Sequence, residues 1–201
     1  MYQKNMTDYL NKLSELMLAT EVTGEDDTTL SLDQGAAKVV DMILEVRSGS
    51  QKIILVGNGG SSAIVSHVQN DLCKAVGARA MVFTEQPLLT ALTNDLGYDY
   101  VYEKCTELWA EAGDLFLAVS SSGKSENILR AARAALNSGC RLITLSGFDS
   151  DNPLRQIGNL NFYVNSNVYG YVETAHAALT HFMTDKAMMM VRNHSLNNTK
   201  A

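Results

Sequence analysis

Runs of apolar residues alternate with amphipathic segments along most of the chain, and the spacing predicts strands and helices in turn. Five short runs have the length and composition of buried strands: KIILVG at 52–57, RAMVFT at 79–84, DLFLAVS at 114–120, RLITLSG at 141–147 and LNFYVN at 160–165. Helical spacing appears between them, as in SENILRAARAALNSG. Because continuously apolar strands that alternate with helices are typical of a parallel sheet covered on both faces, we predict an α/β fold with a doubly wound, five-stranded parallel sheet.

The N-terminal region adds helices to this core. Residues 5–18 repeat apolar side chains at helical spacing: Met6, Tyr9, Leu10, Leu13, Met17 and Leu18. The acidic stretch TGEDDTTLSLD at 23–33 is interpreted as a linker, and Asp33 as the cap of a second helix that runs through Ala36 to Val46. We expect one domain over 1–201, in which 1–48 supply helices for packing or oligomerisation and 52–193 form the α/β core.

Composition narrows the possible partners. The 201 residues are 46% hydrophobic, enough for one core, and the net charge of −6 disfavours nucleic acid as a ligand. No apolar run approaches the roughly 18 residues of a membrane span, and the N-terminus is amphipathic, so we expect a cytoplasmic protein without membrane contact. Cys73, Cys105 and Cys140 are odd in number, widely spaced and without a CxxC pair, so they are interpreted as buried residues without disulfide or metal.

Three polar loops are expected at the ligand-binding edge of the sheet, where the carboxyl ends of parallel strands meet. They are VGNGGSSA at 56–63, SSSGKS at 120–125 and LSGFDSDN at 145–152. The first invites a dinucleotide interpretation. However, Ser62 stands where GxGxxG requires its third glycine, and Thr84 ends the next strand in place of an acidic residue. Both departures argue against NAD.

The loop SSSGKS resembles the end of a triphosphate-binding P-loop. That motif needs a glycine five positions before the Gly-Lys-Ser triplet, and Ala118 stands there. The serines and the helix that follows offer hydroxyls and amides for a single phosphate. Lys124 is then a residue of the helix start, and helix capping alone remains the alternative.

Acidic residues and histidines recur on two predicted helices. His67 and Asp71 are four apart and share a helix face, where they could bind a metal, flank a reacting carbon or make an ordinary helix contact. Glu173 and His181 lie eight apart, about 12 Å along a straight helix. They could meet at one ion only if Glu173 precedes the regular helix, if the side chains lean strongly together, or if they come from different subunits. His176 is interpreted as a supporting core or interface residue.

The order of these motifs resembles the sugar isomerase (SIS) domain, a flavodoxin-like fold, and within it the phosphoheptose isomerases. The likeness covers nearly the whole chain and includes GNGGSS, ALTNDLGYD, SSSGKSENI, TLSGFD and the final Glu/His pair. The resemblance implies isomerisation of sedoheptulose 7-phosphate to D-glycero-D-manno-heptose 7-phosphate, a precursor of activated heptoses for lipopolysaccharide. It also implies a zinc ion, no organic cofactor, and a homotetramer with active sites between subunits.

The resemblance also implies roles for individual residues. The implied substrate contacts are Asn58, Gly59, Gly60, Asn94, Asp95, Ser120, Ser121, Ser122, Ser125 and Glu173, with the serines binding the phosphate. The implied zinc ligands are His67, Asp71, Glu173 and His181, of which Asp71 and His181 also transfer protons. Imidazole and carboxylate ligands equally suit nickel, cobalt or iron.

Three departures from the family pattern concern the site. Asp71 replaces the usual glutamate, and Glu173 replaces the usual glutamine. The stretch CKAVGARA is shorter than in the family and leaves Lys74 and Arg79 as the cations near it in sequence. Two alternatives stay open: an isomerase of another phosphosugar, and a non-catalytic SIS protein that binds the bacterial replication initiator.

Overall fold

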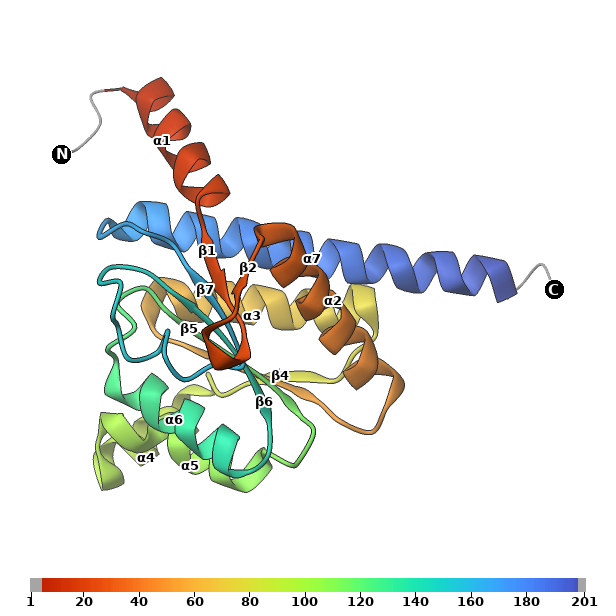
Figure 1. Cartoon of the computed structure of the whole chain (residues 1–201). Coiled ribbons are helices and arrows are strands. Elements are labelled where there is room, and N and C mark those ends of the chain that lie inside the picture. The colour runs from red at the N-terminus through yellow and green to blue at the C-terminus, as the bar shows by residue number, and fades with distance from the viewer. Residues whose placement is uncertain (1–4, 199–201) are drawn as a thin grey trace.

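The computed structural model describes residues 5–198 and contains one mixed sheet between two layers of helices (Figure 1). The strands are β1 Glu21–Thr23, β2 Thr29–Leu30, β3 Ile53–Gly57, β4 Ala80–Val82, β5 Leu115–Ser120, β6 Arg141–Ser146 and β7 Leu160–Tyr163. The α-helices are α1 Met6–Leu18, α2 Leu32–Ser48, α3 Gly59–Asp71, α4 Gln86–Leu96, α5 Val101–Trp109, α6 Glu126–Asn137 and α7 Tyr169–Asn198. Short helical turns are η1 Glu25–Asp27, η2 Leu72–Val76 and η3 Tyr98–Tyr100, of which η2 is a π-helix.

The sheet confirms the predicted parallel strands and extends them. Its order is β2-β1-β7-β6-β5-β3-β4, and the five strands from β7 to β4 are parallel. β1 pairs antiparallel with β7 and with β2, which makes seven strands in place of the predicted five. The prediction of a linker at 23–33 is therefore wrong. Strands of two or three residues carry too few side chains for a hydrophobic pattern and form through backbone pairing, β1 with β7 and β2 with β1.

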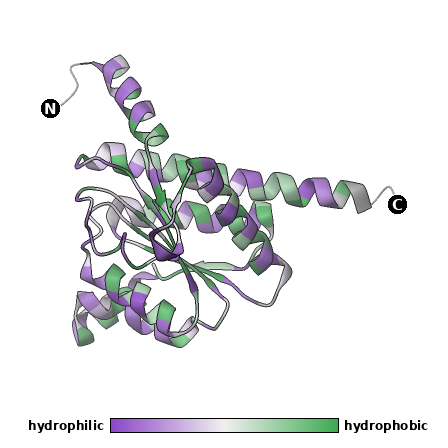
Figure 2. Ribbon diagram, in the orientation of Figure 1, coloured by the Kyte–Doolittle hydropathy of each residue, from purple (hydrophilic) through white to green (hydrophobic). Residues whose placement is uncertain are grey.

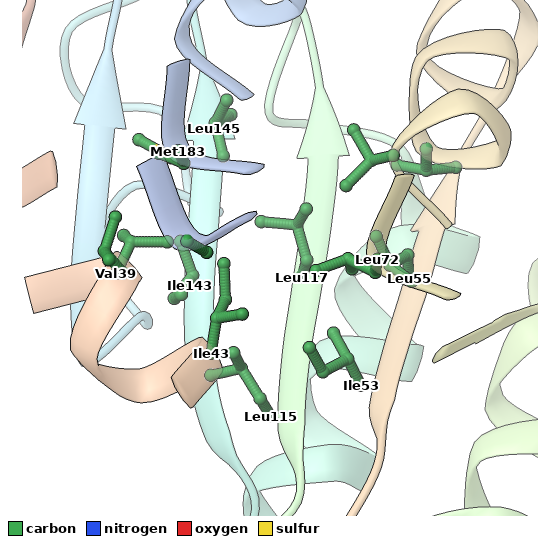
Figure 3. Close-up of a cluster of buried hydrophobic side chains, with 14 of the residues drawn as sticks. Val39, Ile43, Ile53, Leu55, Leu72, Leu115, Leu117, Ile143, Leu145 and Met183 are labelled. Carbon is green, nitrogen blue, oxygen red and sulfur yellow. The ribbon is translucent and has the colours of Figure 1, made fainter. Parts of the chain in front are cut away.

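Alternate side chains of the strands supply two separate cores. Ile53 and Leu55 of β3 pack under α2, α3 and α7, whereas Ile54 and Val56 pack under α5 and α6. Figure 3 shows the first core, in which Met183 of α7 meets the sheet. The helices carry hydrophobic and hydrophilic positions together, consistent with one face on the sheet and one in solvent (Figure 2).

The two N-terminal helices begin and pack differently. α1 projects from the body and contacts α7 through Leu13 and Leu16 (Figure 1). The N-cap of α2 is Ser31, two residues before Asp33, so the prediction that Asp33 caps this helix is wrong. The Ser31 hydroxyl accepts from the Gln34 amide at 3.2 Å, and Gln34 Oε1 accepts from the Ser31 amide at 2.9 Å. This reciprocal capping box satisfies two amides at once, which a lone Asp33 does not.

The remaining predictions concern cysteines and membranes. Cys105 and Cys140 are buried, as predicted, but Cys73 is exposed. Cys73 lies in η2, between the buried residues Leu72 and Val76. Among residues 5–198, no helix is both long and apolar enough to span a membrane.

Candidate active site

The first loop places glycines where the chain approaches α7. β3 ends at Gly57, and α3 starts at Gly59 with Asn58 as its N-cap. A Cβ atom added to Gly60 would lie 2.5 Å from the Glu173 carboxyl carbon. An alanine at position 60 would therefore force the Glu173 carboxylate away from the start of α3.

The second loop has the features of a phosphate cradle. Ser120 and Ser121 are buried at the end of β5, and the Ser121 hydroxyl has no hydrogen-bond partner within the described chain. Ser125 is the N-cap of α6, yet its side chain makes no capping hydrogen bond to the described residues. This argues against the alternative that the serines only cap the helix. The buried Ser121 hydroxyl, unpartnered within residues 5–198 and beside the start of a helix, is suited to an anion.

Lys124 does not point into this cradle. Its ammonium group lies 2.6 Å from the Asp149 carboxylate, in the third loop. The hydrogen bond and charge of Asp149 raise the pKa of Lys124. The structure therefore agrees with the interpretation of Lys124 as a helix-start residue and not as a triphosphate ligand.

The first two loops and α7 enclose a pocket of about 240 Å³. Its lining residues are Asn58, Gly59, Gly60, Ser61, Ser120, Ser121, Ser122, Ser125, Tyr169 and Glu173. These include all of the predicted substrate contacts except Asn94 and Asp95. Sequence reasoning missed Ser61 and Tyr169, although Tyr169 lies four residues before Glu173 and shares its helix face.

Asn94 and Asp95 lie elsewhere in the described chain. Both are exposed near the end of α4, and the Asn94 amide donates to the Asp95 carboxylate at 2.8 Å. Neither lines the pocket. Their segment reaches the site through Tyr98, whose hydroxyl donates to Asn58 Oδ1 at 2.9 Å.

A hydrogen-bonded network that sequence reasoning missed supports the first loop. The amides of Asn58 and Asn127 exchange two hydrogen bonds, each 2.9 Å. The Tyr102 hydroxyl donates to the Gly57 carbonyl at 2.9 Å. Burial, with Tyr98 nearby, raises the pKa of Tyr102 to about 12, so the phenol stays protonated as a donor. The network joins the first loop to α5 and α6.

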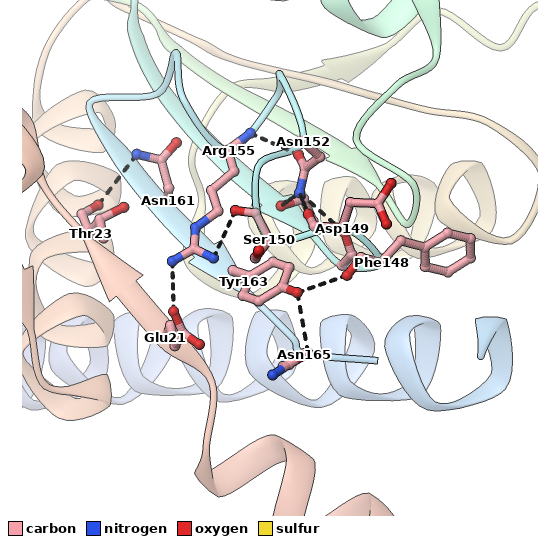
Figure 4. Close-up of polar contacts among 12 residues, drawn as sticks. Glu21, Thr23, Phe148, Asp149, Ser150, Asn152, Arg155, Asn161, Tyr163 and Asn165 are labelled. Atoms are coloured by element: carbon pink, nitrogen blue, oxygen red, sulfur yellow. Dashed lines mark hydrogen bonds and ion pairs between the residues drawn. The ribbon is translucent and has the colours of Figure 1, made fainter. Parts of the chain in front are cut away.

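The third loop lies directly behind the phosphate cradle. Asn152 is fully buried, and its amide donates to the Gly147 carbonyl at 3.1 Å and to the Asp149 carbonyl at 2.9 Å. The Leu154 amide donates to the Gly123 carbonyl at 3.1 Å. Figure 4 shows Asn152 at the centre of this loop. The loop expected at the ligand edge thus supports the second loop and does not line the pocket.

A cluster of two imidazoles and one carboxylate lies between α3 and α7. Asp71 Oδ2 is 3.5 Å from His67 Nε2 and 3.6 Å from His181 Nδ1. The centroids of the two imidazole rings are 4.8 Å apart. One possible ligand atom from each of the three residues lies within 4.8 Å of the other two. Such a donor set fits a first-row divalent ion and leaves positions for other ligands.

Glu173 is not part of this cluster. α7 is already regular at Tyr169, so Glu173 lies inside the helix, about 12 Å along the axis from His181. Its carboxylate contacts the start of α3 near Gly60. Within one chain, the predicted four-ligand set is therefore divided between the pocket and the His67/Asp71/His181 cluster.

His176 is a core residue between these two sites on α7. It is fully buried, and its Nε2 lies 3.2 Å from the Ser146 carbonyl at the end of β6. Burial lowers the pKa of His176 to about 4, so the ring is neutral at pH 7. This agrees with the interpretation of His176 as a supporting residue.

The expected cations do not enter the pocket. The Arg79 guanidinium donates to the Gln51 carbonyl at 3.0 Å, at the amino ends of the strands and thus at the opposite edge of the sheet. Lys74 is exposed in η2. An anion in the pocket would therefore be bound by hydroxyls and amides.

Known proteins share this fold and this sequence pattern. A family model described as SIS domain matches residues 8–147, which include β3 to β6 and the first two loops of the site. A phosphoheptose isomerase from Helicobacter hepaticus is 30% identical over 162 residues, which cover 77% of this chain and 82% of that protein. The chain therefore belongs to the SIS domain family and, within it, to the phosphoheptose isomerases.

Solved structures show the same fold. A phosphoheptose isomerase from Neisseria gonorrhoeae is similar with a TM-score of 0.77 and 24% identity, over 90% of this chain and 93% of that one. One from Francisella tularensis is similar with a TM-score of 0.78 and 21% identity, over 92% and 96%.

Proposed function

We propose that this chain isomerises the ketose sedoheptulose 7-phosphate to the aldose D-glycero-D-manno-heptose 7-phosphate. The observation that supports this most is that α3 and α7 each connect the pocket to the His67/Asp71/His181 cluster. Gly60 and His67 are about 10 Å apart along α3, and Glu173 and His181 about 12 Å along α7. This separation suits an extended sugar with its phosphate at one end and its carbonyl at the other.

The cradle at Ser120–Ser125 would hold the phosphate. Ser121 offers a buried hydroxyl without a partner in the described chain, and Ser122 and Ser125 line the same pocket. Contacts with the phosphate are remote from the carbons that react. They would fix the position of the sugar and so reduce the entropy lost on reaching the transition state.

Asp71 and His181 would move the proton. Isomerisation transfers a proton between neighbouring carbons through an enediol, which requires a base and an acid. Asp71 Oδ2 lies 3.6 Å from His181 Nδ1, so both groups would reach the same part of a bound substrate, one as base and the other as acid. The aspartate is one methylene shorter than the family's glutamate, yet in this structure it lies near both imidazoles.

We propose a zinc ion as cofactor, held by His67, Asp71 and His181. When bound, such an ion polarises the carbonyl and hydroxyl oxygens of a substrate. Asp71 is the least exposed of the three side chains, at 23%, and its carboxylate lies between the two imidazoles. Glu173 would join the ion only from a partner subunit, because its own helix separates it from His181.

We further propose a cytoplasmic homotetramer, in which the whole chain acts as one SIS domain, in lipopolysaccharide precursor synthesis. Exposed apolar side chains support assembly. Leu88 and Leu96 of α4 are 45% and 44% exposed, and Phe182 and Met189 of α7 are each 54% exposed. On each helix the two side chains are seven or eight residues apart and so lie near one face, which suits contact with another subunit. Sedimentation equilibrium should give the mass of a tetramer, and a monomer at assay concentration would contradict assembly.

The activity is tested with metal-free protein and sedoheptulose 7-phosphate, before and after zinc is added, with aldose formation followed directly. We expect zinc-dependent turnover. His181→Gln should lower kcat by about 10²-fold or more because it removes the proton-transfer group, whereas Ser122→Ala should mainly raise KM. Full turnover by His181→Gln would refute the assignment. Folded protein without turnover would favour another phosphosugar, or the non-catalytic alternative if no phosphosugar reacts.

A further inference from the structure

Tyr169 is an aromatic residue at a pocket that is otherwise lined by small and polar side chains. It is the first residue of α7 and is 59% exposed. Four residues separate it from Glu173, so both side chains leave the helix on one face, and both line the pocket with the serines of the second loop. Tyr169 thus lines the pocket where the pocket opens to solvent.

The position of the Tyr169 ring is set by Phe148. The two rings pack edge to face, with centroids 4.8 Å apart at 67°. Phe148 has φ of +59°, a left-handed conformation that is uncommon for a bulky residue and costs roughly 1–2 kcal/mol. Its amide donates to the Ser166 carbonyl at 2.9 Å, and its carbonyl accepts from the Tyr163 hydroxyl at 2.7 Å. Strain that is held by contacts on both sides is typical of functional sites.

The residues behind Phe148 make this support rigid. The Arg155 guanidinium lies 4.2 Å from the centre of the Tyr163 ring and 2.7 Å from the Glu21 carboxylate of β1. It also donates to the Ser150 carbonyl at 3.2 Å. Figure 4 shows the loop held between β1 and β7, with Phe148 at its end. Phe148 is therefore fixed to the sheet.

The Tyr169 hydroxyl is free to meet a ligand. It makes no hydrogen bond to any residue of the described chain, although the ring is held by Phe148. A phenol of this kind offers a flat apolar face to the C–H groups of a sugar and a donor or acceptor to its hydroxyls. Neither contact is available to a free phosphate ion bound at the serines.

We propose that Tyr169 is a substrate-contacting residue that makes the pocket selective for the sugar portion of a phosphosugar. The proposal rests on the proposed function, since it takes the serines to hold the phosphate. Phe148 is then a positioning residue that acts through Tyr169. The chemistry required of the ligand is a polyhydroxylated carbon chain next to a phosphate monoester.

Binding of two probes separates this role from a general effect on the pocket. Calorimetry on the full chain measures Kd for sedoheptulose 7-phosphate and for inorganic phosphate. We expect Tyr169→Ala to raise the Kd for the sugar phosphate about 10-fold and to change that for phosphate less than about twofold, because ring contact and hydrogen bond are lost together. Tyr169→Phe should give a smaller increase, since it removes only the hydroxyl.

Controls make every outcome decisive. Trp109→Ala removes another exposed aromatic, outside the pocket, and should change neither Kd. If Tyr169→Ala raises the Kd values of both probes by the same factor, or changes neither, the proposal is overturned. If wild-type protein binds the sugar phosphate without turning it over, the isomerase function fails, and the ratio of the two Kd values still decides the role of Tyr169. Wild-type protein that binds neither probe overturns both.

Discussion

Replacing Gly123 with alanine tests whether the phosphate cradle depends on the loop behind it. Gly123 has φ of +63°, where an alanine costs about 1 kcal/mol. Its new Cβ would also lie 2.8 Å from the Asn152 Cβ and closer still to Asn152 Cγ and Oδ1. Asn152 is fully buried and has little room to move.

The magnitude follows from what Asn152 would lose. Its amide donates to the Gly147 and Asp149 carbonyls, and its Oδ1 accepts from the Arg155 amide at 3.0 Å. Each such bond contributes about 1 kcal/mol, so a displacement that breaks two or three, together with the backbone strain, should lower the free energy of unfolding by about 3–4 kcal/mol. The KM for the sugar phosphate should rise as well, because Ser122 adjoins Gly123.

Urea unfolding followed by circular dichroism at one protein concentration measures the effect. Gly77→Ala is the matched control. Gly77 has φ of +76°, but its added Cβ would meet only Arg47, at 3.8 Å, so it should lose about 1 kcal/mol. Adding Asn152→Gly to Gly123→Ala removes the collision, and the double variant should be less stable than Asn152→Gly by only about 1 kcal/mol. A Gly123→Ala variant as stable as Gly77→Ala would refute the reasoning.

Three further predictions concern single side chains. Lys124→Ala should change KM for the sugar phosphate less than about twofold in steady-state kinetics, because the Lys124 ammonium pairs with exposed Asp149. A larger increase in KM would show that Lys124 contacts the substrate. His176 has a folded pKa of about 4, below its ordinary value, so the stability it contributes is full above about pH 6.5 and is lost as pH falls toward 4. The unfolding free energy of wild type should therefore fall between pH 7 and 5 by about 2 kcal/mol more than that of His176→Gln, and equal slopes would contradict this. Asp71→Asn should weaken zinc binding by 10-fold or more in a competition titration with a chelator, because it removes the carboxylate of the cluster, and unchanged affinity would exclude Asp71 as a ligand.

Much of the fold could be predicted because its signals are local. The strands β3, β5 and β6 are apolar on both faces, so each produces an unbroken hydrophobic run in the sequence. The spacing of helical residues also placed His67 beside Asp71 on one face of α3. β1 and β2 have no such signal, because strands this short form through backbone pairing, β1 with β7 and β2 with β1.

The candidate site was only partly visible in the sequence. The loops after β3 and β5 were expected together because parallel strands end at one edge of the sheet, and the structure brings them into one pocket. The sequence alone also identified the residue types suited to a metal and a phosphate. It carried no sign that Asn152 lies behind Gly123, or that Tyr98 holds Asn58, since those contacts join segments far apart in the chain.

Tertiary structure decided that residues of α7 contribute to two different sites. Helical geometry alone placed Glu173 and His181 about 12 Å apart. Only the packing of α7 beside α3 determined that Glu173 faces Gly60 while His181 meets Asp71. The sequence therefore determines the α/β class and its chemical groups, because these depend on local periodicity and composition. Which groups share a site depends on how the helices dock on the sheet, and that is fixed by contacts over long sequence separation.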